Sequence, residues 1–124
     1  MAGRGKLHSE RLSSALVRQG RLSEAAQKTL LSLIEPTDDY GALTGCDLII
    51  EAVYENRAVK EAVTREALPH LSADGFFASN TSTLPISGLA QTVRQPNRFI
   101  GIHFFSPVDK MRVVEIIRGE QTDD

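Results

Sequence analysis

The feature that most constrains the fold is an alternation of short apolar runs with amphipathic segments along residues 47–117. Each run is rich in β-branched or aromatic residues and is bounded by glycine or polar turn residues, which is typical of strands. Strands are expected at 47–53, 75–79, 98–104 and 112–117, with helices at 57–71 and 86–93. This order predicts an α/β fold with a doubly wound, mostly parallel sheet. The nearly continuous apolar character of 47–53 predicts a strand covered on both faces.

A helical hairpin is expected before the sheet. Ser9 and Ser23 are of a type that caps helix N-termini, and apolar residues at helical spacing follow each of them. Gly20 and Pro36 are of the types that end helices. Residues 1–8 are expected to form a disordered leader, 9–118 a single partial domain, and 119–124 a tail.

Composition narrows the class of protein. The net charge of −2 gives no electrostatic reason to expect nucleic acid as a partner, and no apolar run reaches the length of a membrane span. Cys46 is the only cysteine, so no intramolecular disulfide is possible, and a reducing cytoplasm is the expected location.

Polar residues gather directly after the predicted strands, where sheets of this kind bind ligands. Glu55 and Lys60 follow the first strand, Asn80 and Ser82 the second, and Ser106 the third. Simpler interpretations remain open at this point. The run 79–83 has the composition of a capped turn, and the Glu55–Lys60 segment that of a solvated helix start.

His103 and Glu115 both lie within apolar runs of consecutive strands. A carboxylate is costly to bury without a partner, and a carboxylate bonded to one imidazole nitrogen fixes the tautomer and steadies the imidazolium. The sequence therefore predicts a general-base dyad, with a buried structural ion pair as the alternative.

Three segments together resemble the 3-hydroxyacyl-CoA dehydrogenases: 47–56 (DLIIEAVYEN), 77–84 (FASNTSTL), and 101–111 (GIHFFSPVDKM) with 114–117 (VEII). The sequence of the 101–111 segment is most similar to that of the multifunctional β-oxidation proteins. The resemblance implies an NAD-dependent enzyme that oxidises 3-hydroxyacyl-CoA to 3-oxoacyl-CoA in fatty-acid β-oxidation.

The same resemblance implies roles for individual residues. His103 matches the catalytic base and Glu115 the acid that orients it. Ser82 matches a serine at the substrate hydroxyl and the thioester region of CoA. The remaining matches concern NAD: Glu55 and Lys60 contact it, Asn80 lies near the nicotinamide, and Ser106 stands where an asparagine usually contacts the carboxamide.

The chain also departs from the usual dinucleotide-binding pattern. That pattern opens with a strand and a G-x-G-x-x-G loop, but Gly3 and Gly5 are followed by His8 at the third glycine position. The chain is therefore expected to be a partial, Rossmann-like domain that lacks the N-terminal strands and the glycine loop, and to be inactive or weakly active alone. The missing first strand would leave an apolar sheet edge, which favours self-association.

Two other functions remain open. The same residues could persist in a non-catalytic remnant that serves as a scaffold or interaction module. Another Rossmann-type dehydrogenase acting on a small hydroxy acid is a further alternative, although the spacing of the three segments argues against it.

Overall fold

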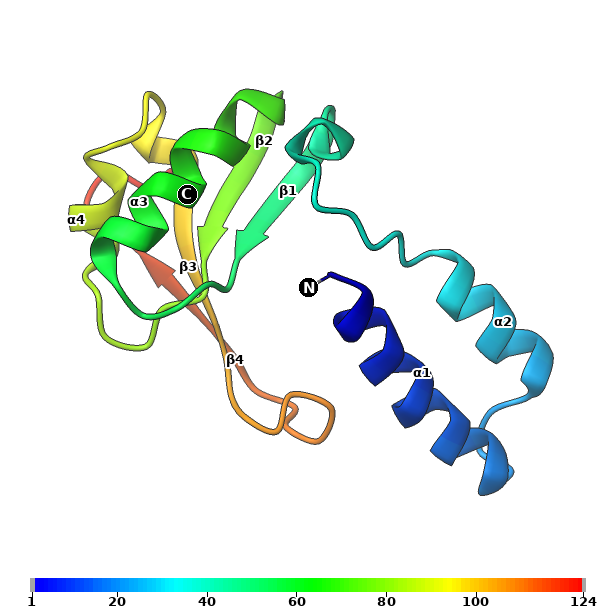
Figure 1. Ribbon diagram of the computed structural model, residues 1–124. Helices are drawn as coiled ribbons and strands as arrows, with labels where there is room; N and C mark the ends of the chain where they lie inside the picture. Colours follow the sequence, from blue (N-terminus) through cyan, green and yellow to red (C-terminus); the bar gives the residue numbers. More distant parts are fainter. Residues whose placement is uncertain (1, 124) are drawn as a thin grey trace. The chain divides into compact units, whose positions relative to one another are not determined.

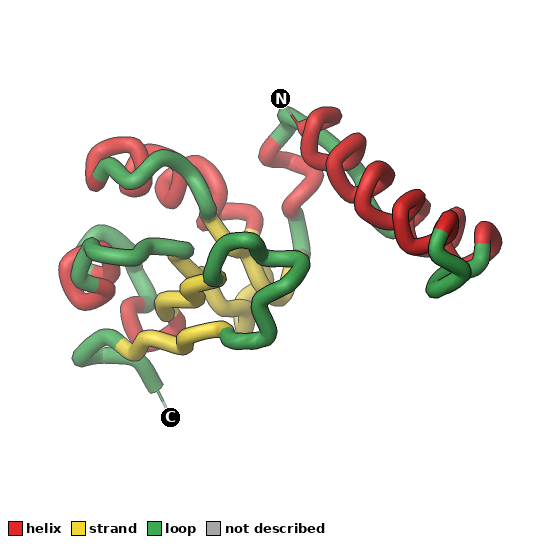
Figure 2. The backbone as a smooth tube through the Cα atoms, turned by 90° about the horizontal axis from the view of Figure 1, so that it is seen from below, coloured by secondary structure: helices red, strands yellow, loops and turns green. Residues whose placement is uncertain are grey.

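In the computed structural model, which describes residues 2–123, the N-terminal unit is a hairpin of two helices (Figures 1 and 2). Helix α1 spans Ala2–Arg18 and α2 spans Glu24–Ser32. Gly20 ends α1 with a φ of 68°, in the left-handed region that favours glycine. The Ser23 hydroxyl caps α2 by accepting from the Ala26 amide at 3.1 Å. The predicted helical hairpin is therefore confirmed.

The start of the chain differs from the disordered leader that was expected over residues 1–8. Helix α1 already begins at Ala2, so Ser9 lies inside it rather than at its N-cap, and Met1 lies outside the described residues. Within this unit the Lys6 ammonium donates to the Ile34 carbonyl at 2.8 Å, beyond the end of α2. That bond ties the first turns of α1 to the segment that follows α2, which accounts for their order.

The second unit, from Leu43 onward, is a four-stranded sheet in the order β1-β2-β3-β4. Its strands are β1 (Cys46–Glu51), β2 (Leu71–Ser79), β3 (Phe99–Phe104) and β4 (Val114–Arg118), and its helices are α3 (Arg57–Ala67) and α4 (Ile86–Ala90). Short 3-10 turns, η1 (Tyr40–Leu43), η2 (Leu68–His70) and η3 (Pro96–Arg98), precede β1, β2 and β3. The first three strands are parallel and β4 is antiparallel to β3, so the mostly parallel α/β sheet is confirmed. None of the helices in residues 2–123 combines the length and apolar character of a membrane-crossing segment.

Helices α3 and α4 cover one face of this sheet, and Figure 1 shows α3 lying across the strands. Each right-handed crossover moves one strand further in the same direction, so both helices must lie on the same side. Ile49, Phe77 and Phe99 point to that face and form the core with Ile86 and residues of both helices.

The opposite face is open, contrary to the expectation that the first strand would be covered on both faces. Leu48 and Ile50 of β1, Phe76 of β2 and Ile116 of β4 are all exposed. The near-continuous apolar run of β1 therefore reflects two apolar faces, of which only one is buried within the described residues.

The expected tail, 119–124, is packed against the sheet through residue 123. The Thr122 hydroxyl donates to the Phe99 carbonyl at 2.8 Å and accepts from the Gly119 amide at 2.9 Å. The Asp123 amide donates to the Asn97 carbonyl at 2.9 Å. These bonds satisfy backbone groups at the start of β3, which composition alone does not reveal.

Gly101 allows α4 to approach β3, and we expect Gly101→Ala to destabilise the unit. An added Cβ would lie 2.8 Å from Cδ1 of Ile86 and 2.9 Å from Cβ of Ile117. Overpacking of this kind costs about 1–3 kcal/mol of unfolding free energy, measurable by denaturant titration. Gly88→Ala in α4 is the matched control, because its Cβ would meet nothing closer than 3.7 Å and alanine favours a helix. Equal stability of the two variants would contradict the close approach.

Candidate active site

His103 and Glu115 lie directly opposite each other on the antiparallel strands β3 and β4. Nδ1 of His103 is 2.8 Å from Oε2 of Glu115, and the imidazole ring packs against the Phe105 ring with centroids 4.7 Å apart. The imidazole is 21% exposed and the carboxylate 53% exposed. Glu115 is therefore not the buried carboxylate that its apolar neighbours suggest, because its strand lies at the sheet edge.

The contact decides which imidazole nitrogen is available for chemistry. An ionised carboxylate can only accept hydrogen bonds, so Nδ1 of His103 carries the hydrogen and donates it in a hydrogen bond to Glu115. Nε2 is then left with a lone pair and has no partner among the described residues. A histidine held in this way can accept a proton at Nε2 while the carboxylate steadies the resulting charge.

The segment Asn80–Thr83 leaves the carboxyl end of β2 beside the β3 strand that carries His103. The side-chain oxygen of Asn80 accepts from the backbone amide of Phe104 at 3.0 Å. The backbone amide of Asn80 donates to the Glu51 carbonyl at 2.8 Å. Asn80 thus connects this segment to the residue that follows His103. Ser82 is exposed, and its hydroxyl has no partner within residues 2–123.

One carboxylate oxygen of Glu55 accepts several hydrogen bonds from backbone amides and hydroxyls of this segment. Its Oε1 accepts from the hydroxyl of Thr81 at 2.5 Å, from the amide of Ser82 at 3.1 Å and from the amide of Thr83 at 3.2 Å. Burial alone would raise the pKa of Glu55. The hydrogen bonds from Thr81 and Lys60, with those from the loop amides, instead lower that pKa from 4.5 to about 2. Glu55 is therefore a charged group that orders the loop.

Lys60 does not face open space, although the sequence suggests a cofactor contact. Its side chain is 1% exposed, and its ammonium lies 3.0 Å from Oε1 of Glu51 and 3.3 Å from Oε2 of Glu55. The Ser79 hydroxyl also donates to Glu51. Lys60 thus sits between two carboxylates behind the loop.

Ser106 follows β3 in the hairpin loop that leads to β4, and it is exposed. Its hydroxyl has no hydrogen-bond partner in the described part of the chain. Figure 1 shows this loop projecting beyond the sheet. Ser106 is therefore free to contact a ligand, but the protein does not fix its side chain.

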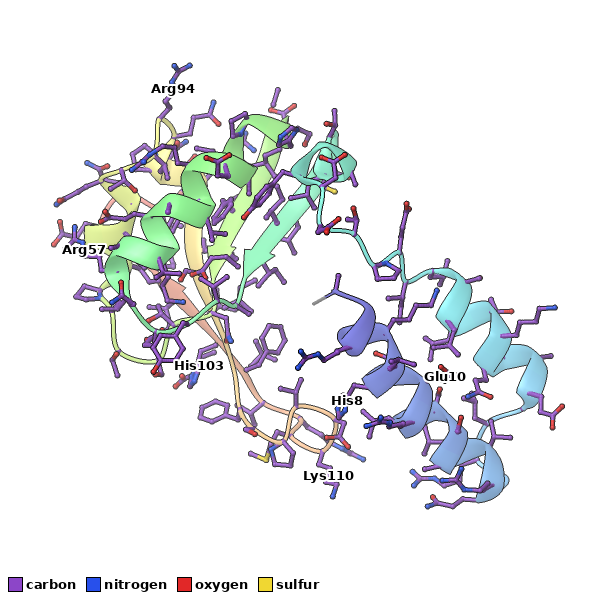
Figure 3. The ribbon with its side chains drawn as sticks, viewed as in Figure 1. His8, Glu10, Arg57, Arg94, His103 and Lys110 are labelled. Atoms are coloured by element: carbon purple, nitrogen blue, oxygen red, sulfur yellow. The ribbon has the colours of Figure 1, made fainter. Side chains whose placement is uncertain are left out.

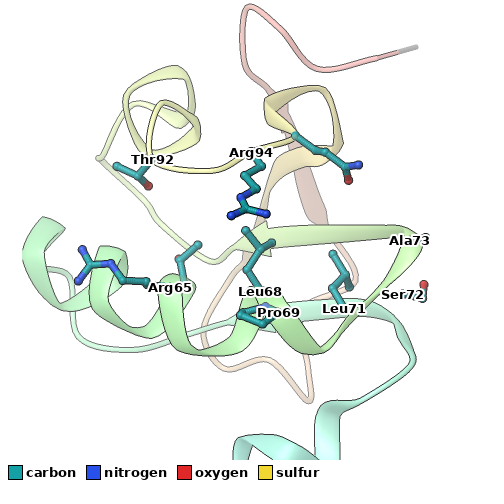
Figure 4. Close-up of a pocket in the computed structure, with 10 residues that line it drawn as sticks. Arg65, Leu68, Pro69, Leu71, Ser72, Ala73, Thr92 and Arg94 are labelled. Atoms are coloured by element: carbon teal, nitrogen blue, oxygen red, sulfur yellow. The ribbon is translucent and has the colours of Figure 1, made fainter.

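A pocket of about 550 Å³ lies at the other end of the sheet, away from His103. Figure 3 places Arg94 and His103 at opposite ends of the unit, and Figure 4 shows Arg94 above Leu68 in the pocket. Its lining residues come from α3, η2, the start of β2 and the loop before β3: Thr64, Arg65, Leu68, Pro69, Leu71, Ser72, Ala73, Thr92, Arg94 and Gln95. This pocket takes no part in the site at the carboxyl ends of the strands.

Comparison with known proteins decides the family. The family model described as the NAD-binding domain of 3-hydroxyacyl-CoA dehydrogenase matches residues 2–124. The chain belongs to this family. The resemblance read from the three sequence segments is therefore confirmed.

Relatives and solved structures agree with this assignment. The chain is 42% identical over 120 residues to the fatty acid oxidation complex subunit alpha of Pseudomonas putida, covering 97% of the chain and 17% of that protein. It matches an (S)-3-hydroxybutyryl-CoA dehydrogenase from Ralstonia eutropha with a TM-score of 0.94 and 34% identity, over 99% of the chain and 44% of that structure. The Escherichia coli 3-hydroxybutyryl-CoA dehydrogenase gives a TM-score of 0.92 and 29% identity, over 98% and 26%. The chain spans about a sixth of the length of the curated relatives it matches.

NAD is the cofactor of this dehydrogenase family, and the residues present fit one end of it. The hydroxyls of Ser82 and Ser106 and the amide of Asn80 are groups that can pair with a nicotinamide carboxamide. The charged Glu55 suits ribose hydroxyls better than phosphates. The sequence contains no glycine-rich loop to hold the pyrophosphate.

Two members of this candidate site, Glu51 and Thr81, were not predicted from the sequence. Glu51 and Thr81 hold Lys60 and Glu55, respectively. Glu51 could have been found by the argument applied to Glu115, because it too is a carboxylate within an apolar strand. Thr81 carries no such signal, since its role depends on a partner 26 residues away.

The lowered pKa of Glu55 predicts a pH-dependent contribution to stability. A carboxylate with a depressed folded-state pKa stabilises the fold above pH 4.5, and this contribution is lost as the pH falls from 4.5 towards 2. The advantage of the wild type over Glu55→Gln should therefore shrink across that window. Because the side chain is 36% exposed, we expect the difference to be at most about 1 kcal/mol. Unfolding titrations of both proteins at several pH values measure it, and a difference that does not change with pH would contradict the prediction.

Proposed function

We propose that this chain carries the proton-transfer site of an NAD-dependent 3-hydroxyacyl-CoA dehydrogenase acting in fatty-acid β-oxidation. His103 is the base and Glu115 is the residue that orients it. The observation that carries the proposal is the 2.8 Å contact between Nδ1 of His103 and Oε2 of Glu115. Membership of the dehydrogenase family supports the type of reaction. The contact supports the proton transfer, because it leaves Nε2 of His103 able to accept a proton.

In the proposed reaction the 3-hydroxyl of the acyl-CoA donates its proton to Nε2 of His103. Bound NAD would supply the hydride acceptor for the oxidation at C3. Glu115 holds the ring through Nδ1 and offsets the positive charge that the imidazole gains. The product is the 3-oxoacyl-CoA.

The polar residues around His103 take supporting roles in this proposal. The free hydroxyl of Ser82 binds the substrate hydroxyl and the thioester region. Asn80 and Ser106 lie on the nicotinamide side, and Glu55 contacts the ribose with its exposed edge. Lys60 acts through the carboxylates that surround it, because its ammonium is buried. The cytoplasmic location expected from the sequence stays a prediction.

We expect His103→Gln to lower 3-hydroxyacyl-CoA-dependent NAD reduction by about 10²–10⁴-fold, because the variant has no base. Glu115→Gln should lower it less, since the base remains but loses its orienting charge. The 124 residues hold no glycine-rich loop, so we expect the wild-type rate to be slow, and NADH formation should be followed at high protein concentration.

Both substitutions should leave the unfolding free energy within about 1 kcal/mol of the wild type, because the pair is partly exposed. This makes stability the internal control. Turnover that survives His103→Gln would exclude the dyad. Absence of turnover in the wild type, together with no binding of NAD or acetoacetyl-CoA in calorimetric titrations, would favour the non-catalytic scaffold.

We also propose that the chain self-associates through β1, which has a neighbouring strand on one side only within the described sheet. Ile50→Lys should reduce the associated fraction, because an edge lysine opposes strand pairing. Val59→Lys on α3 is a matched control, since Ile50 is 40% and Val59 41% exposed. Light scattering over a concentration series measures both variants, and a monomeric wild type at all concentrations would refute the proposal.

A further inference from the structure

A buried ion pair lies behind the loop that carries Ser82. Nζ of Lys60 is 3.0 Å from Oε1 and 3.1 Å from Oε2 of Glu51, and both side chains are almost completely buried. Taking two charges out of water is costly, and an apolar pair of similar volume often stabilises a fold as well or better. Joining β1 to α3 therefore does not by itself account for these two charges.

Lys60 also contacts a second carboxylate, and this contact leads to the site. Its ammonium lies 3.3 Å from Oε2 of Glu55. The other oxygen of Glu55 accepts the bonds from Thr81, Ser82 and Thr83. Each oxygen of Glu55 thus has a different task, one facing the buried ammonium and the other facing the loop.

The charges explain why Glu51 is needed in addition to Glu55. Lysine has a long, flexible side chain, so an ammonium held by Glu55 alone could follow that carboxylate towards solvent. Glu51 holds the ammonium from the interior, and is itself fixed by the hydroxyl of Ser79 and, at 3.2 Å, by the amide of Val53. The ammonium is therefore a fixed point to which Glu55 is bound.

We propose that the Glu51–Lys60 pair positions the Ser82 loop through Glu55. Glu51 is thereby a positioning residue for substrate binding, although its burial keeps it from touching any ligand. The functional part of this inference rests on the role proposed above for Ser82. The structural part, the dependence of the loop on a buried pair, does not.

The test uses Glu51→Gln/Lys60→Met in the 124-residue chain. The glutamine oxygen can accept from the Val53 amide while its NH2 group donates to the Ser79 hydroxyl, and methionine replaces the lysine stem without a charge. No buried ion is then left unpaired. Single removal of Glu51 would strand a buried ammonium and could prevent folding. Ala67→Gly is the matched control, because Ala67 is buried in the same helix and has no hydrogen bond to the cluster.

The primary measurement is amide hydrogen exchange of Ser82 and Thr83 by NMR. In the double variant we expect exchange at these amides to be faster by about tenfold or more relative to β2 and β3, because Glu55 loses its cation. In Ala67→Gly we expect any increase to be uniform across the unit. The inference would be overturned if these two amides exchanged at the wild-type rate in the double variant. It would also be overturned if their exchange rates rose equally in the double variant and in Ala67→Gly.

A second measurement connects the pair to the reaction. If the pair acts through Ser82, adding Ser82→Ala to the double variant should cause little further loss of turnover. Independent, additive losses would overturn the functional part. The exchange measurement requires no substrate, so it decides the structural part of the inference even if the wild type shows no turnover. Failure of the proposed function and failure of this inference are therefore distinguishable.

Discussion

The right-handed crossover between parallel strands brings the carboxyl ends of β1, β2 and β3 to one edge of the sheet. Glu51, Ser79 and Gly101 lie in one register across these strands. The residues that directly follow these three strands therefore lie close together at this edge of the sheet. The apolar core beneath, in which the Phe77 and Phe99 rings stack with centroids 5.6 Å apart, keeps the strands in that register.

Ion pairs, in addition to the strand register, hold the polar groups together at this edge of the sheet. The Glu51–Lys60–Glu55 cluster spans β1, α3 and the turn between them, and it draws in the loop that follows β2. A buried charged cluster contributes less to stability than an apolar one, but its geometry is stricter, because each charge must meet its partners. Such a cluster suits a loop whose exposed serine must be held in place.

The strand β4 interrupts the parallel order, and the dyad depends on this interruption. A parallel neighbour would have to return through a long crossover, whereas an antiparallel neighbour follows directly through a hairpin. The hairpin sets His103 directly across from Glu115, so the proposed base and the acid proposed to orient it come from one local unit. The pair needs only this hairpin, which explains why it forms in a chain whose sequence contains no glycine-rich loop.

Local patterns in the sequence determined the elements and their types. The strands around Ile49, Phe77 and Ile102, the Ser23 cap and the glycine at position 20 follow from residue periodicity and backbone preference, which act over a few neighbours. The proximity of His103 to Glu115 could also be anticipated, because consecutive strands joined by a short turn usually pair.

Only the tertiary structure decided which side chains are buried and which charges meet. Lys60 was expected to face a cofactor and is instead enclosed by two carboxylates, while Glu115 was expected to be buried and is half exposed. The open face of β1 and the packed residues 119–123 likewise depend on which elements cover the sheet. Burial and ion pairing join residues that are far apart in the chain, so no local pattern can specify them.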